Sequence, residues 1–133
     1  DQGVGVIPWS PLARVFLTGS RNRDREKKTP RAGADGFADN LYFQKTDFQV
    51  LDVVLEVAEE REIKPAQVAL AWVLSVPAVT APIIGATKVD YIDDAVTALD
   101  VELTDEEIGR LEAPYVPHPV LGHTQPTVRS VSI

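Results

Sequence analysis

The sequence predicts an α/β fold built from strand and helix units. Two short apolar runs are typical of buried strands, amphipathic stretches follow each of them, and the order is strand, loop, two helices, strand, helices. Parallel strands of this kind need helices on both faces, and two strands cannot complete such a sheet. The chain has 133 residues, about half of the roughly 250 that an eight-unit barrel requires. We therefore expect a truncated α/β architecture.

The first strand is expected within residues 1–10, where an apolar run is bounded by prolines. A loop over residues 10–45 follows. Its segment Arg21–Arg31 holds six Lys or Arg against two acids, in a chain that is otherwise acidic. This local excess of positive charge favours an anion as the ligand of the loop, although such charge runs are often only solvated surface.

Two helices are predicted within residues 46–75. Apolar side chains recur at helical spacing from Phe48 through Leu51 and Leu55 to Ala58, with acidic side chains on the opposite face. Pro65 suits the first turn of the second helix, which is rich in strong helix formers and should be deeply packed, with Trp72 in the core.

The second strand is expected at residues 79–84, which are rich in β-branched side chains. Helices are predicted within residues 89–113, and Thr104 to Glu107 has the pattern of a capping box. Residues 114–133 form a Pro-rich tail, expected to be extended. The units 1–10, 10–45, 46–75, 79–84, 89–113 and 114–133 are taken as parts of one domain.

Composition excludes several classes of function. The formal net charge is -7 and cysteine is absent, which disfavours nucleic-acid binding and removes disulfides, thiolate metal sites and cysteine nucleophiles. No apolar stretch approaches the roughly 20 residues of a membrane span. His118 and His123, the only histidines, lack the spacing and carboxylate partners of a metal site, so no metal is expected. We expect a soluble, cytoplasmic protein.

Three stretches occur in an order and spacing that match one known family. They are Gly5–Ala13 (GVIPWSPLA), Pro65–Leu74 (PAQVALAWVL) with Pro82–Lys88 (PIIGATK), and Leu111–Tyr115 (LEAPY) with Pro117–Pro119 and Gly122–His123. Together they resemble the aldo-keto reductase superfamily, in its bacterial and potassium-channel β-subunit-like branches. The resemblance implies the C-terminal part of a (β/α)8 TIM barrel, with this chain supplying the last two barrel strands and a nicotinamide cofactor as ligand.

The resemblance also implies the residues that would bind the cofactor. The loop carrying Trp9, Ser10, Leu12 and Arg14 would line its pyrophosphate, and Ser10 could donate to a phosphate oxygen. An ordinary strand exit with Trp9 in the core is the alternative. Val15 stands where relatives usually have Gly, and because a β-branched residue disfavours positive φ, this departure is expected to reshape the loop.

At the other end of the cofactor the resemblance implies a site for the adenosine 2'-phosphate. It involves Arg31 and the segment with Gly85, Thr87 and Lys88, while Tyr91 and Asp94 would contact the adenine end. Asp90, Asp93 and Asp94 would oppose a 2'-phosphate if they face it. NADP(H) is therefore the expected cofactor, NAD stays possible, and a plain helix cap with a solvated lysine is the alternative.

The family's catalytic Asp, Tyr, Lys and His would precede this segment. Assigning the catalytic tyrosine to Tyr42, Tyr91 or Tyr115 would violate the motif order, so no catalytic residue is expected. The main hypothesis is the cofactor-binding C-terminal part of an NADP(H)-dependent reductase of aldehydes or ketones, with the carbonyl substrate bound through upstream sequence. A non-catalytic cofactor-binding or channel-subunit-like module and an inactive fragment are the alternatives. Self-association is expected, because the strands lack neighbours.

Overall fold

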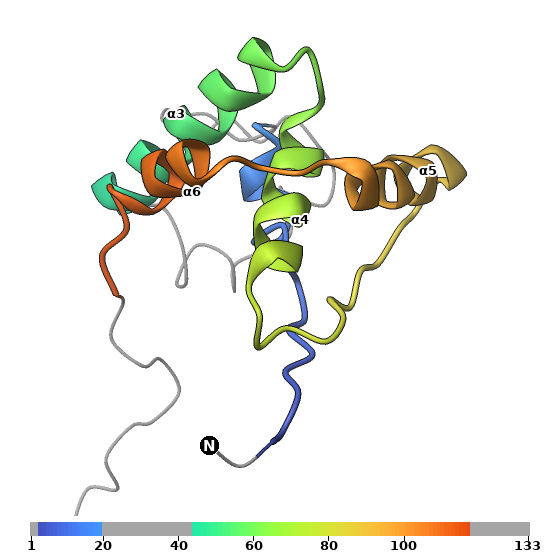
Figure 1. The fold of residues 1–133 in the computed structure, drawn as a ribbon. Helices are drawn as coiled ribbons and strands as arrows, with labels where there is room; N and C mark the ends of the chain where they lie inside the picture. The colour runs from blue at the N-terminus through green and yellow to red at the C-terminus, as the bar shows by residue number, and fades with distance from the viewer. Residues whose placement is uncertain (1–2, 20–43, 118–133) are drawn as a thin grey trace, which may run out of the picture.

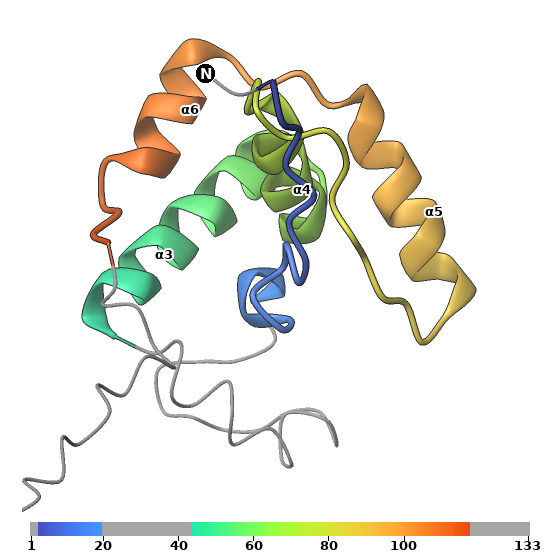
Figure 2. The same ribbon diagram turned by 90° about the horizontal axis from the view of Figure 1, so that it is seen from below.

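A computed structural model of the chain describes residues 3–19 and 44–117, and in this part helices dominate. Figure 1 and Figure 2 show α4 at the centre, with α3 and α6 on one side of it and α5 on the other. The elements, in chain order, are η1 (Phe16–Thr18), α3 (Lys45–Glu60), α4 (Pro65–Ser75), α5 (Val89–Thr97), η2 (Ala98–Asp100) and α6 (Asp105–Glu112).

The core lies where α3, α4 and α6 meet. Val57 and Val68 are fully buried there, and Leu111 from α6 packs against them. Gln44 and Asp47 cap the start of α3, and Pro65 occupies the first turn of α4 as expected. Leu51 and Ala58 of the apolar spacing are buried, whereas Leu55 is 38% exposed.

A capping box and ion pairs fix α6 against α3. The capping box expected at Thr104 is present: the Glu107 amide donates to the Thr104 hydroxyl, and the Glu107 carboxylate accepts from the Thr104 amide at 2.7 Å. The same carboxylate accepts two bonds from the Arg61 guanidinium, the one from Nη2 at 2.6 Å. Arg110 makes a second forked pair with Glu60. These hydrogen bonds hold the pKa of Glu107 at about 2 and lower that of Glu60.

The two expected strands are present only as two parallel isolated bridges, Val6 with Val79 and Trp9 with Ile83. Neither segment 1–10 nor segment 79–84 forms a regular strand in the described residues, which corrects that expectation. The reason lies in the prolines. After Thr80 N–H donates to Val6 O at 2.8 Å, the next two ladder donors would be Pro8 and Pro82, and neither has an N–H. Pairing resumes one residue late, where Ile83 N–H donates to Pro8 O.

Gly5 allows the two segments to approach closely. A Cβ at this position would lie 2.0 Å from the Thr80 hydroxyl oxygen, so a larger residue fits there only if Thr80 moves. The rest of the segment is open to solvent, with Val4 and Ile7 78% and 60% exposed. The apolar face of α5 is also uncovered, and no residue of this helix is buried.

Candidate functional site

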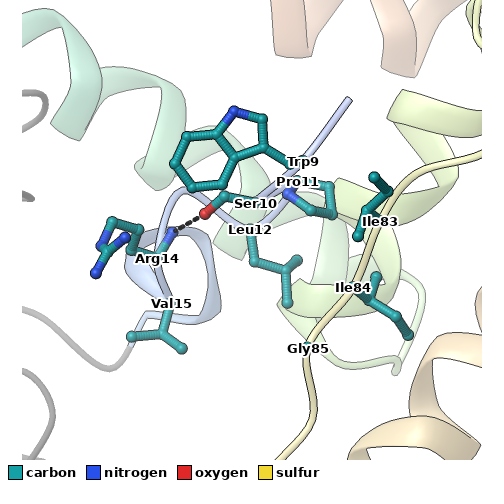
Figure 3. Close-up of a pocket in the computed structure, with 9 residues that line it drawn as sticks. All are labelled: Trp9, Ser10, Pro11, Leu12, Arg14, Val15, Ile83, Ile84 and Gly85. Carbon is teal, nitrogen blue, oxygen red and sulfur yellow. Dashed lines mark hydrogen bonds between the residues drawn. The ribbon is translucent and has the colours of Figure 1, made fainter. Parts of the chain in front are cut away.

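A pocket of about 290 Å³ opens where the two extended segments end. It is lined by Trp9, Ser10, Pro11, Leu12, Arg14, Val15, Ile83, Ile84 and Gly85. Figure 3 shows that these side chains come from the loop after the first segment and from the end of the second. Because the segments run parallel, their carboxyl ends meet at one edge, the place where α/β proteins bind ligands.

The structure brings together half of the residues predicted to bind the cofactor. Trp9, Ser10, Leu12 and Arg14 line the pocket with Gly85. Trp9 is 65% exposed, so the alternative in which its side chain packs in the core is wrong. Ile83, Ile84 and Pro11 also line the pocket; sequence reasoning missed their role, although the apolar run at Ile83 could have indicated it.

The loop at the pocket turns through consecutive left-handed residues. Ala13, Arg14 and Val15 have φ values of 46°, 52° and 67°, and the Arg14 amide donates to the Ser10 hydroxyl at 3.2 Å (Figure 3). The turn delivers Phe16 directly into the core, where it is 2% exposed. Val15 therefore adopts a left-handed conformation that glycine accepts without strain. For a β-branched side chain this conformation raises the energy of the folded state.

Replacing Val15 by glycine is expected to stabilise the chain by about 1 kcal/mol, because relief of left-handed strain outweighs the added freedom of the unfolded chain. The midpoint of urea unfolding measures this. Val15→Ala is the matched control: it removes the branched carbons but keeps the Cβ, so its gain should be smaller. A loss of stability in Val15→Gly would mean that side-chain packing dominates at this position.

The remaining predicted residues lie at the start of α5. Lys88 is its N-cap and makes no side-chain cap, so the described part of the chain supplies no side chain to the first N–H groups of this helix. Thr87 precedes it, and Gly85 has open space where a Cβ would stand. The Lys88 ammonium lies 5.7 Å from the centre of the Tyr91 ring. Exposed donors and positive charge at a helix N-terminus suit an anion.

Asp94 has a partner that the sequence did not reveal. Its two carboxylate oxygens accept from the Lys64 ammonium at 2.6 and 2.8 Å. Lys64 is the N-cap of α4, thirty positions earlier in the chain, and no spacing rule connects the two residues. The hydrogen bond to Asp94 raises the pKa of Lys64.

Other predicted features lie outside the described residues. Arg31 and the basic segment 21–31 fall there, as do His118, His123 and most of the tail 114–133. Within residues 3–19 and 44–117, no three His, Cys, Asp or Glu side chains gather in a way that could hold a metal ion. None of the helices in the same part is long and apolar enough to cross a membrane.

Two parallel extended segments thus end at one pocket, with helices following each of them. The sequence profile named Aldo/keto reductase family matches residues 1–115, and the chain belongs to the aldo/keto reductase family.

Three curated relatives extend this match. The chain is 39% identical over 120 residues to a Schizosaccharomyces pombe protein provisionally named aryl-alcohol dehydrogenase, covering 90% of this chain and 33% of that one. It is 43% identical over 120 residues to versiconal hemiacetal acetate reductase of Aspergillus parasiticus, with coverages of 88% and 34%. An aldo-keto reductase of Fusarium vanettenii is 37% identical over 126 residues, with coverages of 93% and 33%. The chain thus spans about a third of the length of these relatives.

Proposed function

We propose that the chain forms the C-terminal, cofactor-binding part of a (β/α)8 barrel reductase that uses NADP(H). The observation that carries this proposal is the pocket at the carboxyl ends of two parallel segments, which gathers Trp9, Ser10 and Gly85 in a member of the aldo/keto reductase family. Within residues 3–19 and 44–117 the two segments pair only with each other and leave apolar side chains exposed, as expected of strands that belong to a larger barrel.

The residues present fit such a cofactor. The pocket volume of about 290 Å³ lies near the lower end for ligand pockets, so it suits one part of a dinucleotide rather than the whole. Its wall combines apolar side chains with the Ser10 hydroxyl and Arg14, a combination that accepts a flat ring or a sugar beside a phosphate. The α5 N-terminus offers N–H groups and Lys88 to a second phosphate.

In the proposed reaction, bound NADPH supplies the hydride that reduces an aldehyde or ketone. This chain's own residues bind and orient. Ser10 and Arg14 hold the pyrophosphate, and Thr87 and Lys88, with Arg31, hold the 2'-phosphate while Tyr91 and Asp94 border the adenine. These contacts are remote from the carbonyl, so they stabilise ground and transition states equally. The proton donor and the substrate walls would come from other parts of the barrel, and Tyr42, Tyr91 and Tyr115 are not assigned to catalysis.

Calorimetric titration of the 133-residue chain with NADPH and NADH tests the proposal. We expect Arg31→Ala to weaken NADPH binding about tenfold, since charge-assisted hydrogen bonds contribute roughly 1.5–3 kcal/mol. Lys88→Ala should cost less, because an exposed lysine is screened, and NADH binding should change little in either variant. Lys45→Ala, which removes a charge from the exposed start of α3, is the control. Absence of binding to both cofactors, or oxidation of NADPH by 4-nitrobenzaldehyde in this chain alone, would contradict the proposal.

The alternatives have the same pocket but differ in chemistry. A non-catalytic cofactor-binding module or an inactive fragment would lack the catalytic Asp, Tyr, Lys and His in any upstream sequence. A cytoplasmic location and self-association of the chain also belong to the proposal. The exposed apolar side chains of residues 4–9 and of α5 support association between copies.

A further inference from the structure

Lys64 connects the start of α4 to the second turn of α5. Its backbone is fixed by the capping pair with Gln67, whose Oε1 accepts from the Lys64 amide at 2.9 Å. From this anchor the ammonium reaches Asp94 on α5 and forms a forked ion pair. The side chains of Lys64 and Asp94 are 61% and 21% exposed, and pairs of this kind add little to stability. The ion pair therefore contributes little to holding the two helices together, and its main effect is on the charge of Asp94.

Negative charge is concentrated in the N-terminal two turns of α5. Asp90, Asp93 and Asp94 lie within its first two turns, and the helix carries no basic residue. Within residues 3–19 and 44–117, the structure shows no ion pair for Asp90 or Asp93. Of the three aspartates, Asp94 is the one that Lys64 binds. The first two turns of α5 thus carry three aspartates, one of them paired with Lys64, and Lys88 stands at the N-cap of the helix.

Removing either lysine would leave a clear excess of negative charge at the N-terminus of α5. A 2'-phosphate carries about two negative charges at neutral pH, whereas a 2'-hydroxyl carries none. Binding of the phosphorylated cofactor is therefore weakened more by this excess of negative charge. Lys88 lies over the Tyr91 ring on the first turn, while Lys64 reaches Asp94 in the second turn from the start of α4. The two cations therefore act on the same short stretch of helix from different elements.

We propose that Lys64 is a positioning residue for cofactor selection: by binding the Asp94 carboxylate it neutralises an acid that would otherwise repel the 2'-phosphate. This inference rests on the proposed cofactor site and adds a residue to it. Lys64 need not touch the cofactor, because it acts through Asp94. The preference for the phosphorylated cofactor should then depend on the ion pair rather than on Lys64 alone.

Binding of two adenosine probes to the 133-residue chain tests this inference. Adenosine 2',5'-bisphosphate and adenosine 5'-monophosphate differ only in the 2'-phosphate, and calorimetry gives both affinities. We expect Lys64→Gln to weaken binding of the bisphosphate about fivefold and that of the monophosphate less than twofold. In 1 M salt the difference should disappear, because charges are screened beyond about 3 Å.

A second substitution that restores bisphosphate binding would show that Lys64 acts by neutralising Asp94 and not by holding the structure in place. Adding Asp94→Asn to Lys64→Gln should restore bisphosphate binding, and Lys64→Arg should bind like the unchanged chain, whereas Lys45→Gln controls for net charge. Equal weakening of both probes, or no rescue by Asp94→Asn, would overturn the role of Lys64 while leaving the cofactor site intact. If the unchanged chain binds neither probe, the proposed function itself fails, and the inference with it.

Discussion

Replacing Phe16 by alanine is expected to lower the free energy of unfolding by about 3–5 kcal/mol, the range for loss of a buried aromatic ring. Phe16 is 2% exposed and is the largest side chain buried so completely in the described residues. Its ring meets that of Phe48 edge to face, with centroids 5.3 Å apart. A loss of this size approaches the whole stability of a small domain, so the variant should be largely unfolded in mild urea.

Urea unfolding followed by circular dichroism measures this effect. Phe16→Leu keeps most of the volume and should cost less than half as much, whereas Tyr115→Ala, at a side chain that is 63% exposed, should change stability by about 0.5 kcal/mol or less. Because Phe16 directly follows Arg14 and Val15 of the pocket wall, Phe16→Ala should also weaken cofactor binding before the helices unfold. Equal stability of Phe16→Ala and Tyr115→Ala would show that the loop does not depend on this anchor.

Glu107→Gln is expected to lower the free energy of unfolding by about 2 kcal/mol, because it leaves the Arg61 guanidinium without its charged partner. The glutamine oxygen can still accept from the Thr104 amide, so the variant separates the ion pair from the capping box. Glu106→Gln in the same first turn of α6 is the control and should change stability by less than 1 kcal/mol. The midpoints of urea unfolding at neutral pH give both values.

The same pair predicts how stability depends on pH. The pKa of Glu107 is about 2 in the folded chain, below the ordinary value of 4.5, chiefly because of its hydrogen bonds with Arg61. A carboxylate with a lowered pKa contributes its full stabilisation above about pH 4.5 and loses it as the pH falls toward 2. Between pH 4.5 and 2, the free energy of unfolding should therefore decrease less with falling pH for Glu107→Gln than for the unchanged chain. An equal decrease in both proteins would mean that other acids, such as Glu60, cause the loss of stability at low pH.

Local rules could predict the helices but not how far the strands would form. The capping pattern at Thr104 and the proline at position 65 depend on a few neighbouring residues, and the structure contains both features. Strand pairing depends on partners that are distant in sequence, and Pro8 and Pro82 become adjacent only once the segments align. In the sequence Pro8 marked only the boundary of an apolar run. Once the segments align, Pro8 and Pro82 together remove two successive ladder donors.

The candidate site was predictable to a similar extent. Family resemblance indicated Ser10 and Gly85, which the structure places around one pocket. Lys64 had no such signal, because its ion pair with Asp94 is created by the packing of α4 against α5. Val15 shows a third case: a departure from the expected glycine was visible in the sequence, but only the backbone angles show that valine accepts the left-handed conformation.

The parallel pairing of Val6 with Val79 also bears on the order in which the chain assembles. Bringing these residues together closes a loop of about 70 residues, and the entropy lost in doing so grows with the logarithm of loop length. The contacts of α4 with α3 and α5 join elements that are neighbours in sequence, so they can form early at little entropic cost. The N-terminal segment should then dock last, onto a helical unit that already exists, and the pocket comes into being only with that final step.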